Sequence, residues 1–203
     1  MTLFRSLIAP VLLIGAPILP AEIITVTTVD DELDPTSEGD ISLREAVRDA
    51  AASDEETTIR FNSTFSANAI FELTRGALQI PSGDHEITID GGVGGVTISG
   101  MMLRTQAGPV SHLIEVNERD VELKNLILQD APNQAVNAFG DNSPEVTLRL
   151  ENVKVRRSGG NGIVCQLSSL VMTRCEVSGS SLTNQNAGSV PRAAVASLSS
   201  KRV

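Results

Sequence analysis

VELKNLILQDA, at residues 121–131, is the stretch that decides the fold. Apolar residues alternate with polar ones as far as Leu123 and alternate again from Leu126, but one residue out of phase, with Asn125 between them. A straight strand cannot shift its phase without turning its apolar side chains to solvent, whereas a corner between two short strands can. Asparagine tolerates the left-handed backbone conformation that such a corner needs. We therefore expect two short strands joined by a corner at Asn125.

The same pattern returns twice further along the chain. LRLENVKVRRS begins at residue 148 and LVMTRCEVSGS at residue 170, so the three segments start 27 and 22 residues apart. Asn152 and Arg174 stand at the position of Asn125. We expect Asn125 and Asn152 to have structural roles at stacked corners, with Arg174 as a poorer third member.

Further short strands complete each repeating unit. We expect them at 135–138 and 162–165, while ITIDGG from residue 87 and VTISG from residue 96 resemble earlier units. Units of this length that stack on their neighbours are typical of a solenoid. The pattern therefore predicts an all-β fold, a right-handed parallel β-helix. A β-sandwich is the alternative, but its hairpins favour turns such as Asn-Gly, which occurs once in the chain.

Outward-facing charges support the stacking of these units in register. At the offsets between the repeats, oppositely charged residues align in four pairs: Glu122 with Arg149, Lys124 with Glu151, Asp130 with Arg157, and Lys154 with Glu176. Neighbouring strands lie about 4.8 Å apart, so each pair would lie side by side. The alignment predicts the register and also gives these charges a structural explanation.

A helix is expected within DISLREAVRDAAASDEETTIRF, residues 40–61. Ser42 and Glu45 fit a capping box, which places the helix from Leu43 to about Ala52. Four apolar residues share one helical face, whereas the opposite face carries charge. The apolar residues are Leu43, Ala46, Val47 and Ala50, and the charged ones are Arg44, Arg48 and Asp49. We expect this helix to cap the open end of the strand array.

The chain divides into four parts at this level. Residues 1–21 resemble a signal peptide, with Arg5 before an apolar stretch, and a membrane anchor is the alternative. Residues 22–61 form an acidic segment with the capping helix, and residues 62–184 form the β-helix. Residues 185–203 are expected to be a flexible tail or a short terminal helix. We therefore expect a secreted or cell-surface protein that has no membrane span after the signal peptide is cleaved.

Almost all of the net charge of −9 lies before residue 61. No basic stripe stands anywhere to meet phosphates, so nucleic-acid binding is not expected. Carboxylates are calcium ligands, which makes Asp30, Asp31, Asp34 and Asp40 weak candidates for a Ca²⁺ site. A solvated acidic loop is the favoured alternative, and no other cofactor is expected.

The segment from Ile24 to Phe61, which contains SLREA at 42–46, resembles the N-terminal module named for its CSLREA signature. This family implies export and a pectin-lyase-like parallel β-helix, and the resemblance extends over residues 24–182. Ile41 stands where the signature has cysteine, so any disulfide made by that cysteine in relatives is absent. The family implies no single chemistry, because fold and function separate.

Candidate catalytic residues are few. A polysaccharide lyase needs a base and a hydrolase needs two placed carboxylates, for which Arg156, Arg157, Asp130 and Asp141 are the available side chains. The sequence has no Trp or Tyr to stack on sugar rings. We therefore expect a non-catalytic structural or adhesive module that binds an extracellular polysaccharide or cell-surface component. A polysaccharide lyase of the pectate-lyase type, intact or decayed, is the alternative.

Other reactive residues stand alone. His85 and His112 have no obvious partners for a zinc site. Cys165 and Cys175 fall at inward positions, where either a disulfide or two buried thiols would fit. Asn62-Ser63-Thr64 is a glycosylation sequon.

Overall fold

The computed structural model describes residues 21–34, 39–67, 69–105, 112–140, 146–166 and 168–185. Within these ranges the chain forms sixteen short strands, one α-helix and one 3-10 helix, η1 (Leu103–Thr105). The strands assemble into three sheets in this part of the chain, and every strand pairing there is parallel. The predicted all-β class and its parallel strands are therefore confirmed. Most of the expected signal peptide, most of the expected tail, and Asp141 lie outside the described residues.

We name the sheets A, B and C. Sheet A contains, in spatial order, β1 (Glu22–Val26), β2 (Thr57–Phe61), β5 (Ile87–Asp90), β8 (Val121–Lys124), β11 (Thr147–Glu151) and β14 (Ser169–Thr173). Sheet B contains β3 (Ile70–Glu72), β6 (Val96–Ser99), β9 (Leu126–Gln129), β12 (Lys154–Arg156) and β15 (Glu176–Ser178). Sheet C contains β4 (Leu78–Ile80), β7 (His112–Asn117), β10 (Gln134–Phe139), β13 (Asn161–Gln166) and β16 (Ser181–Gln185).

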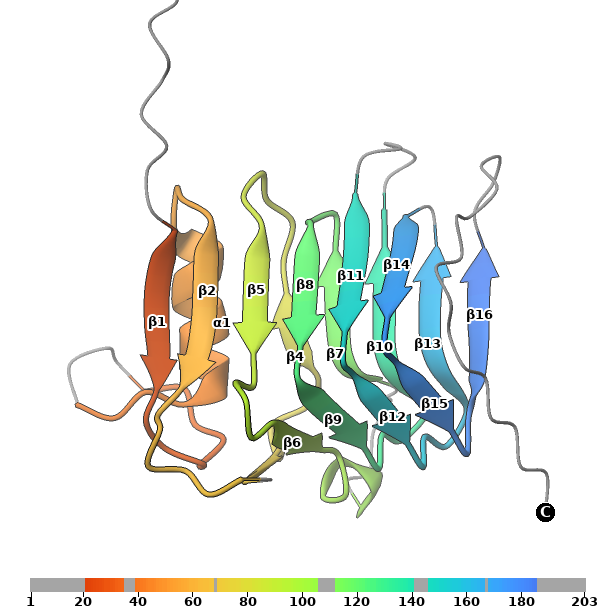
Figure 1. Cartoon of the computed structure of the whole chain (residues 1–203), viewed down its shortest axis with the longest axis horizontal. Helices are drawn as coiled ribbons and strands as arrows, with labels where there is room; N and C mark the ends of the chain where they lie inside the picture. The colour runs from red at the N-terminus through yellow and green to blue at the C-terminus, as the bar shows by residue number, and fades with distance from the viewer. Residues whose placement is uncertain are drawn as a thin grey trace, which may run out of the picture.

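From β2 onward the chain passes through sheets A, B and C in the same order again and again. Each passage adds one strand to every sheet beside the strand of the passage before, so that β5, β6 and β7 lie next to β8, β9 and β10 (Figure 1). This path explains why the sequence repeats with the length of one passage.

The core consists of inward side chains that stack in register along each sheet. Each column is apolar because strands in a parallel array bury the same position of every repeat. The column in sheet A is Ile59, Ile89, Leu123, Leu150 and Met172; in sheet B it is Phe71, Ile98, Leu128, Val155 and Val177; in sheet C it is Ile80, Val116, Ala138 and Cys165. All of these side chains are buried.

The corners between sheets A and B lie where the phase shift predicted them. Asn125, Asn152 and Arg174 have φ angles of 54°, 53° and 54°, in the left-handed region. The two asparagines also form a side-chain ladder. Asn152 Nδ2 donates to Asn125 Oδ1 at 2.9 Å, and Asn125 Nδ2 donates to Asp90 Oδ1 at 2.7 Å. Both asparagines thus lie at corners in the left-handed conformation that the phase shift predicted.

A second set of left-handed corners joins sheets B and C. Asp130, Arg157 and Gly179 have φ angles of 57°, 54° and 67°. Arg157 Nε and Nη2 donate to the two carboxylate oxygens of Asp130 at 2.8 and 2.6 Å. The pair that the sequence alignment predicted is thus present, but its position at a corner was not foreseen.

Helix α1 (Leu43–Ala52) begins as the capping box predicted. Ser42 Oγ accepts from the Glu45 backbone N–H at 3.1 Å, and Glu45 Oε2 accepts from the Ser42 N–H at 2.9 Å. The four apolar residues of its predicted face are all buried in the common core. The helix contacts β1, β2 and β4 and lies at the β1 end of the array (Figure 1). Among the described residues no helix has the length and apolar character needed to cross a membrane.

The register of the outward charges agrees with the sequence alignment, although the ion pairs differ. Arg149 lies opposite Glu122, and Glu151 lies opposite Lys124. Arg149 nevertheless pairs with Glu86 at 2.5 Å, and Lys124 pairs with Glu122 of its own strand at 2.8 Å. Long side chains on a sheet surface reach beyond the adjacent strand, so register alone does not determine the partner.

Candidate functional site

A pocket of about 210 Å³ lies beside the corners that join sheets A and B. Its walls come from the β5–β6 turn, from the asparagine ladder and from the outer face of sheet B. The lining residues are Val93, Gly94, Gly95, Asn125, Leu126, Ile127, Asn152 and Lys154.

The wall from the β5–β6 turn depends on glycine. A Cβ atom at Gly91 would lie 2.2 Å from the Asn125 carbonyl oxygen, so only glycine allows the turn to approach the ladder this closely. Gly95 has a φ angle of 66°. A residue with a Cβ atom would adopt this left-handed backbone conformation only with steric strain. Val93 stands at the tip of the turn and is fully exposed. The local sequence GGVGG thus builds a tight wall with an apolar tip.

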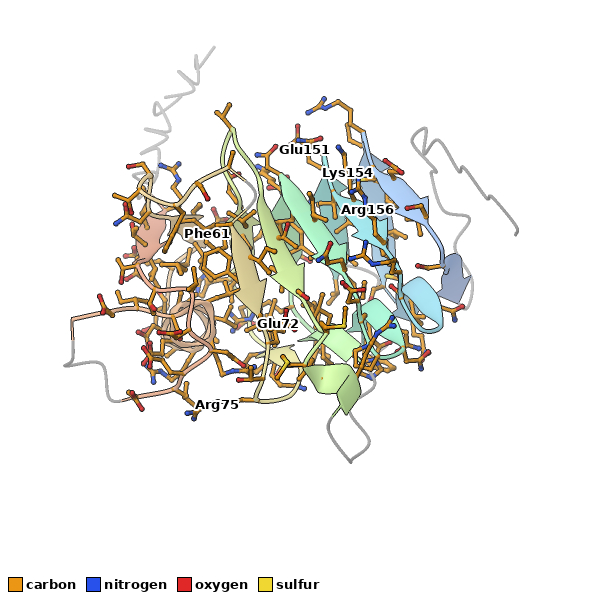
Figure 2. All side chains as sticks on the ribbon, turned by 90° about the horizontal axis from the view of Figure 1, so that it is seen from below. Phe61, Glu72, Arg75, Glu151, Lys154 and Arg156 are labelled. Carbon is orange, nitrogen blue, oxygen red and sulfur yellow. The ribbon has the colours of Figure 1, made fainter. Side chains whose placement is uncertain are left out.

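Two cations occupy the outer face of β12. Lys154 and Arg156 are two residues apart, so their side chains point to the same side of the strand and their Cα atoms are about 6.6 Å apart. Figure 2, which looks at sheet B from outside, shows both along this strand. Within the described ranges neither side chain forms an ion pair. Glu176 lies opposite Lys154 in register, but their charged atoms are not within pairing distance, so the predicted pair is aligned without being formed.

The register neighbours of these cations are of mixed character. Ile127 and Gln129 lie on one side, and Glu176 and Ser178 lie on the other, so Glu176 is the one acidic residue among the four. Lys154 and Asn152 extend the polar surface into the pocket. This arrangement can bind an anion by charge and by amide hydrogen bonds, while Ile127 and Val93 offer apolar contact.

The other predicted catalytic residues are engaged in the fold. Both oxygens of Asp130 accept from Arg157, and the Asp130 side chain is only 4% exposed. Hydrogen bonds from Arg157 hold the pKa of Asp130 below its ordinary value, although burial opposes them. Arg104 adds hydrogen bonds to the carbonyl oxygens of Asp130 and Ala131 at 2.9 Å each. Asp130 and Arg157 therefore stabilise a corner, and Arg156 does not join them.

The acidic segment does not gather its aspartates around a common point. Asp31 Oδ1 accepts from Arg44 Nε at 2.7 Å, and Asp31 Oδ2 accepts from the backbone N–H groups of Thr74 and Arg75 at 2.6 and 2.8 Å. The Asp30 carboxylate accepts from Thr28 Oγ1 at 3.2 Å and has no other hydrogen-bond donor among the described residues. In the described part of the chain no group of three or more His, Cys, Asp or Glu side chains is placed to hold a metal ion.

One expectation about this segment is corrected. Asp31 does not belong to a solvated loop, because its side chain is 2% exposed. Arg44 holds it in place, and the Arg44 guanidinium also donates to the carbonyl oxygens of Gly76 and Ala77 at 2.9 and 3.0 Å. Burial acts to raise the pKa of Asp31, but these hydrogen bonds to Arg44 and the backbone outweigh it and the pKa is lowered.

The histidine and cysteine side chains form no reactive centre. His112 Nε2 lies 3.3 Å from Asn137 Nδ2, and burial lowers the pKa of His112. Cys165 and Cys175 are free and buried, which favours the buried-thiol alternative. Burial raises the pKa of Cys165 to about 11, so its thiol is a weak nucleophile near neutral pH.

The sequence did not predict the pocket or the unpaired cations as one site. Lys154 was assigned to Glu176, and Arg156 was considered together with Arg157 rather than with Lys154. The usable signal was the spacing of two basic residues at alternate positions of one strand, which places them on one face.

Comparisons with protein-family models, with curated proteins and with solved structures find no match to this chain. A proposal about its function therefore has to rest on the geometry of the molecule.

Proposed function

We propose that this protein is an exported, non-catalytic module built as a right-handed parallel β-helix and capped by α1, and that it binds an extracellular or cell-surface polysaccharide of negative charge. The repeated passage through sheets A, B and C supports the β-helix. Crossovers between parallel strands are right-handed in nearly all proteins, which supports the handedness. The resemblance of residues 24–182 to exported CSLREA-signature proteins supports export.

One observation carries the binding proposal. Lys154 and Arg156 present two positive charges on one face of β12 that form no ion pair among the described residues, and the pocket adjoins Lys154. In a protein of net charge −9, two cations on one strand give that surface a local preference for anions. Their Cα atoms are about 6.6 Å apart along the strand, so the two flexible side chains can each bind a carboxylate or sulfate group of the same polymer.

A binding role is favoured over catalysis because the carboxylates of Asp130 and Asp31 are already occupied by hydrogen bonds within the fold. The Asp130 carboxylate is fully occupied by Arg157 and is not free to transfer a proton. The Asp31 carboxylate is similarly occupied by Arg44 and two backbone N–H groups. Neutral sugars usually need aromatic platforms, and the chain has no Trp or Tyr, so charge is the better basis of recognition.

The test compares two double variants with equal net charge. Lys154→Gln/Arg156→Gln removes the two cations of β12, whereas Arg60→Gln/Arg75→Gln removes two exposed arginines elsewhere. Binding of the mature chain to polygalacturonate and to sulfated glycans is measured at low and at high salt. The β12 variant should bind at least about tenfold more weakly, since each lost charge-assisted hydrogen bond is worth about 1.5 kcal/mol or more.

The control variant should bind like the parent protein, and added salt should weaken binding, because exposed charges are screened. Equal loss in both variants would contradict a local site. Equal binding to neutral glycans would contradict recognition by charge. Release of unsaturated uronate, followed by its ultraviolet absorbance, would replace the binding proposal with the lyase alternative.

A further inference from the structure

The turn that follows β2 carries a sequon, the three-residue sequence in which an asparagine can receive an N-linked glycan. Asn62-Ser63-Thr64 is the only Asn-x-Ser/Thr sequence in the chain. It begins one residue after β2 ends, and Ser63 and Thr64 are exposed. None of the groups assigned above to the anion site belongs to this turn.

The turn is held at both ends. The Asn62 N–H donates to the Val26 carbonyl oxygen at 2.9 Å, which continues the pairing of β1 with β2. The Phe65 N–H donates to the Asn62 carbonyl oxygen at 3.0 Å, and the Phe65 ring packs edge-on against Phe71, with 5.3 Å between ring centroids. The sequon is thus displayed on a fixed surface turn.

The amide of Asn62 is oriented by the turn itself. Asn62 Oδ1 accepts from the Thr64 backbone N–H at 3.0 Å, which is an Asx turn. In the described part of the chain Asn62 Nδ2 has no hydrogen-bond partner. By contrast, Nδ2 of Asn125 and Nδ2 of Asn152 both donate within the corner ladder. Of these amides, Asn62 has the nitrogen that is free to be modified without loss of a structural hydrogen bond.

We propose that Asn62 is an attachment site for an N-linked oligosaccharide, an inference that rests on the proposed export of the chain. In the transfer, Nδ2 forms a bond to C1 of the first sugar of a lipid-pyrophosphate-linked oligosaccharide. The bond from C1 to the pyrophosphate breaks, the lipid pyrophosphate leaves with the electron pair, and Nδ2 loses one proton. The Asx turn and the exposed Ser63 and Thr64 allow the folded protein to accommodate the added group.

The experiment expresses the full chain in a eukaryotic secretion host, once with its own N-terminus and once behind a leader of that host. The mass of the secreted protein is measured by mass spectrometry before and after treatment with an amidase that removes N-linked glycans. We expect an added mass that the amidase removes, leaving Asp in place of Asn62. The parallel expression behind the host leader separates failure of export from failure of modification.

Three variants sharpen the result. Asn62→Gln and Thr64→Ala should abolish the added mass, whereas Thr64→Ser should retain it because serine preserves the hydroxyl that the sequon requires. Thermal unfolding of the Asn62→Gln protein should stay close to that of the parent. Secreted protein without added mass would overturn the assignment of Asn62, and added mass that survives Asn62→Gln would place the modification elsewhere. If the protein is retained in the cell when it carries its own N-terminus but is secreted behind the host leader, the result would instead contradict the proposed export.

Discussion

Arg119 Nη2 donates to the carbonyl oxygen of Ala51 at 3.2 Å, although the two residues are 68 positions apart. Ala51 lies in the last turn of α1, which has no basic residue of its own there. A positive charge at this end of a helix is favourable because the helix dipole is negative there. The same Nη2 atom donates to the Ser82 carbonyl oxygen at 3.1 Å. Arg119 therefore ties the end of the helix to the strand array.

The first prediction concerns the space that Arg119 occupies. A Cβ atom at Gly83 would lie 1.6 Å from Arg119 Nη2, and Arg119 is 4% exposed, so the guanidinium has little room to move. Gly83→Ala should destabilise the protein by about 1–3 kcal/mol, the usual cost of overpacking. In an Arg119→Ala background the same substitution should cost much less. Urea unfolding of both single variants and the double variant checks this, and additive effects would contradict the contact.

The second prediction concerns pH. The pKa of Asp31 is lower in the folded protein than its ordinary value of 3.8, because hydrogen bonds from Arg44, Thr74 and Arg75 outweigh the effect of burial. A lowered pKa means that Asp31 contributes stability above pH 3.8 and loses this contribution as pH falls through the folded value. The melting temperature should therefore fall below about pH 4.

Asp31→Asn is the variant that isolates this effect. It should lower the melting temperature at pH 7 and flatten its dependence on pH below about 4. Asp30→Asn is the matched control, because Asp30 is exposed and, in the part of the chain that the structure describes, its carboxylate accepts from Thr28 alone. An Asp31→Asn protein with the same acid transition as the parent would show that other carboxylates dominate it.

The third prediction separates backbone strain from side-chain hydrogen bonding at the corner. Asn125→Ala and Asn125→Gly both remove the bonds to Asp90 and Asn152, but only alanine must strain to adopt a φ of 54°. Asn125→Ala should therefore be less stable than Asn125→Gly by about 1 kcal/mol. Arg174→Gly should be stabilised relative to Arg174→Ala in the same way. Equal stabilities within either pair, measured by denaturant unfolding, would show that the corner relaxes out of the left-handed region.

The corners and the core could be predicted because their signal is local. A one-residue phase shift around Asn125 or Asn152 is visible within a few positions, and it determines which side chains point inward. The capping box of Ser42 and Glu45 is local too. Each of these features depends on neighbours that the sequence itself places side by side.

The remaining contacts depend on which distant segments meet. Asp31 is buried by the β3–β4 connection at Thr74 and Arg75, more than forty positions away, so its acidic neighbours wrongly indicated a solvated loop. Arg119 reaches α1 across a longer gap of 68 positions. Lys154 was paired with Glu176 from the register, but flexible side chains need not meet where their backbones do. Such contacts follow from the assembled array and not from any short stretch of sequence.

The last prediction tests α1 as a cap. The inward columns of sheets A, B and C would be open at the first strands if nothing covered them, and uncovered strand edges and apolar ends promote aggregation. Leu43 is 3% exposed and belongs to the common core, and the helix contacts β1, β2 and β4. Leu43→Asp should cost about 2 kcal/mol or more, because it buries an unpaired charge. Ala52→Asp, at an exposed position of the same helix, should cost less than about 1 kcal/mol.

Removal of residues 22–53 is the stronger form of this test. It takes away β1 and α1 together but leaves every strand from β2 onward. Any aggregation or loss of thermal stability therefore comes from the exposed end and not from the later strands. The shortened chain should aggregate at concentrations at which the parent protein stays in solution, as followed by light scattering. Its remaining soluble fraction should melt at a lower temperature, since the buried faces of β2 and β4 gain contact with water. A shortened chain that stays monomeric and melts at the same temperature would mean that α1 contributes no cover, and the burial of Leu43 would then need another explanation.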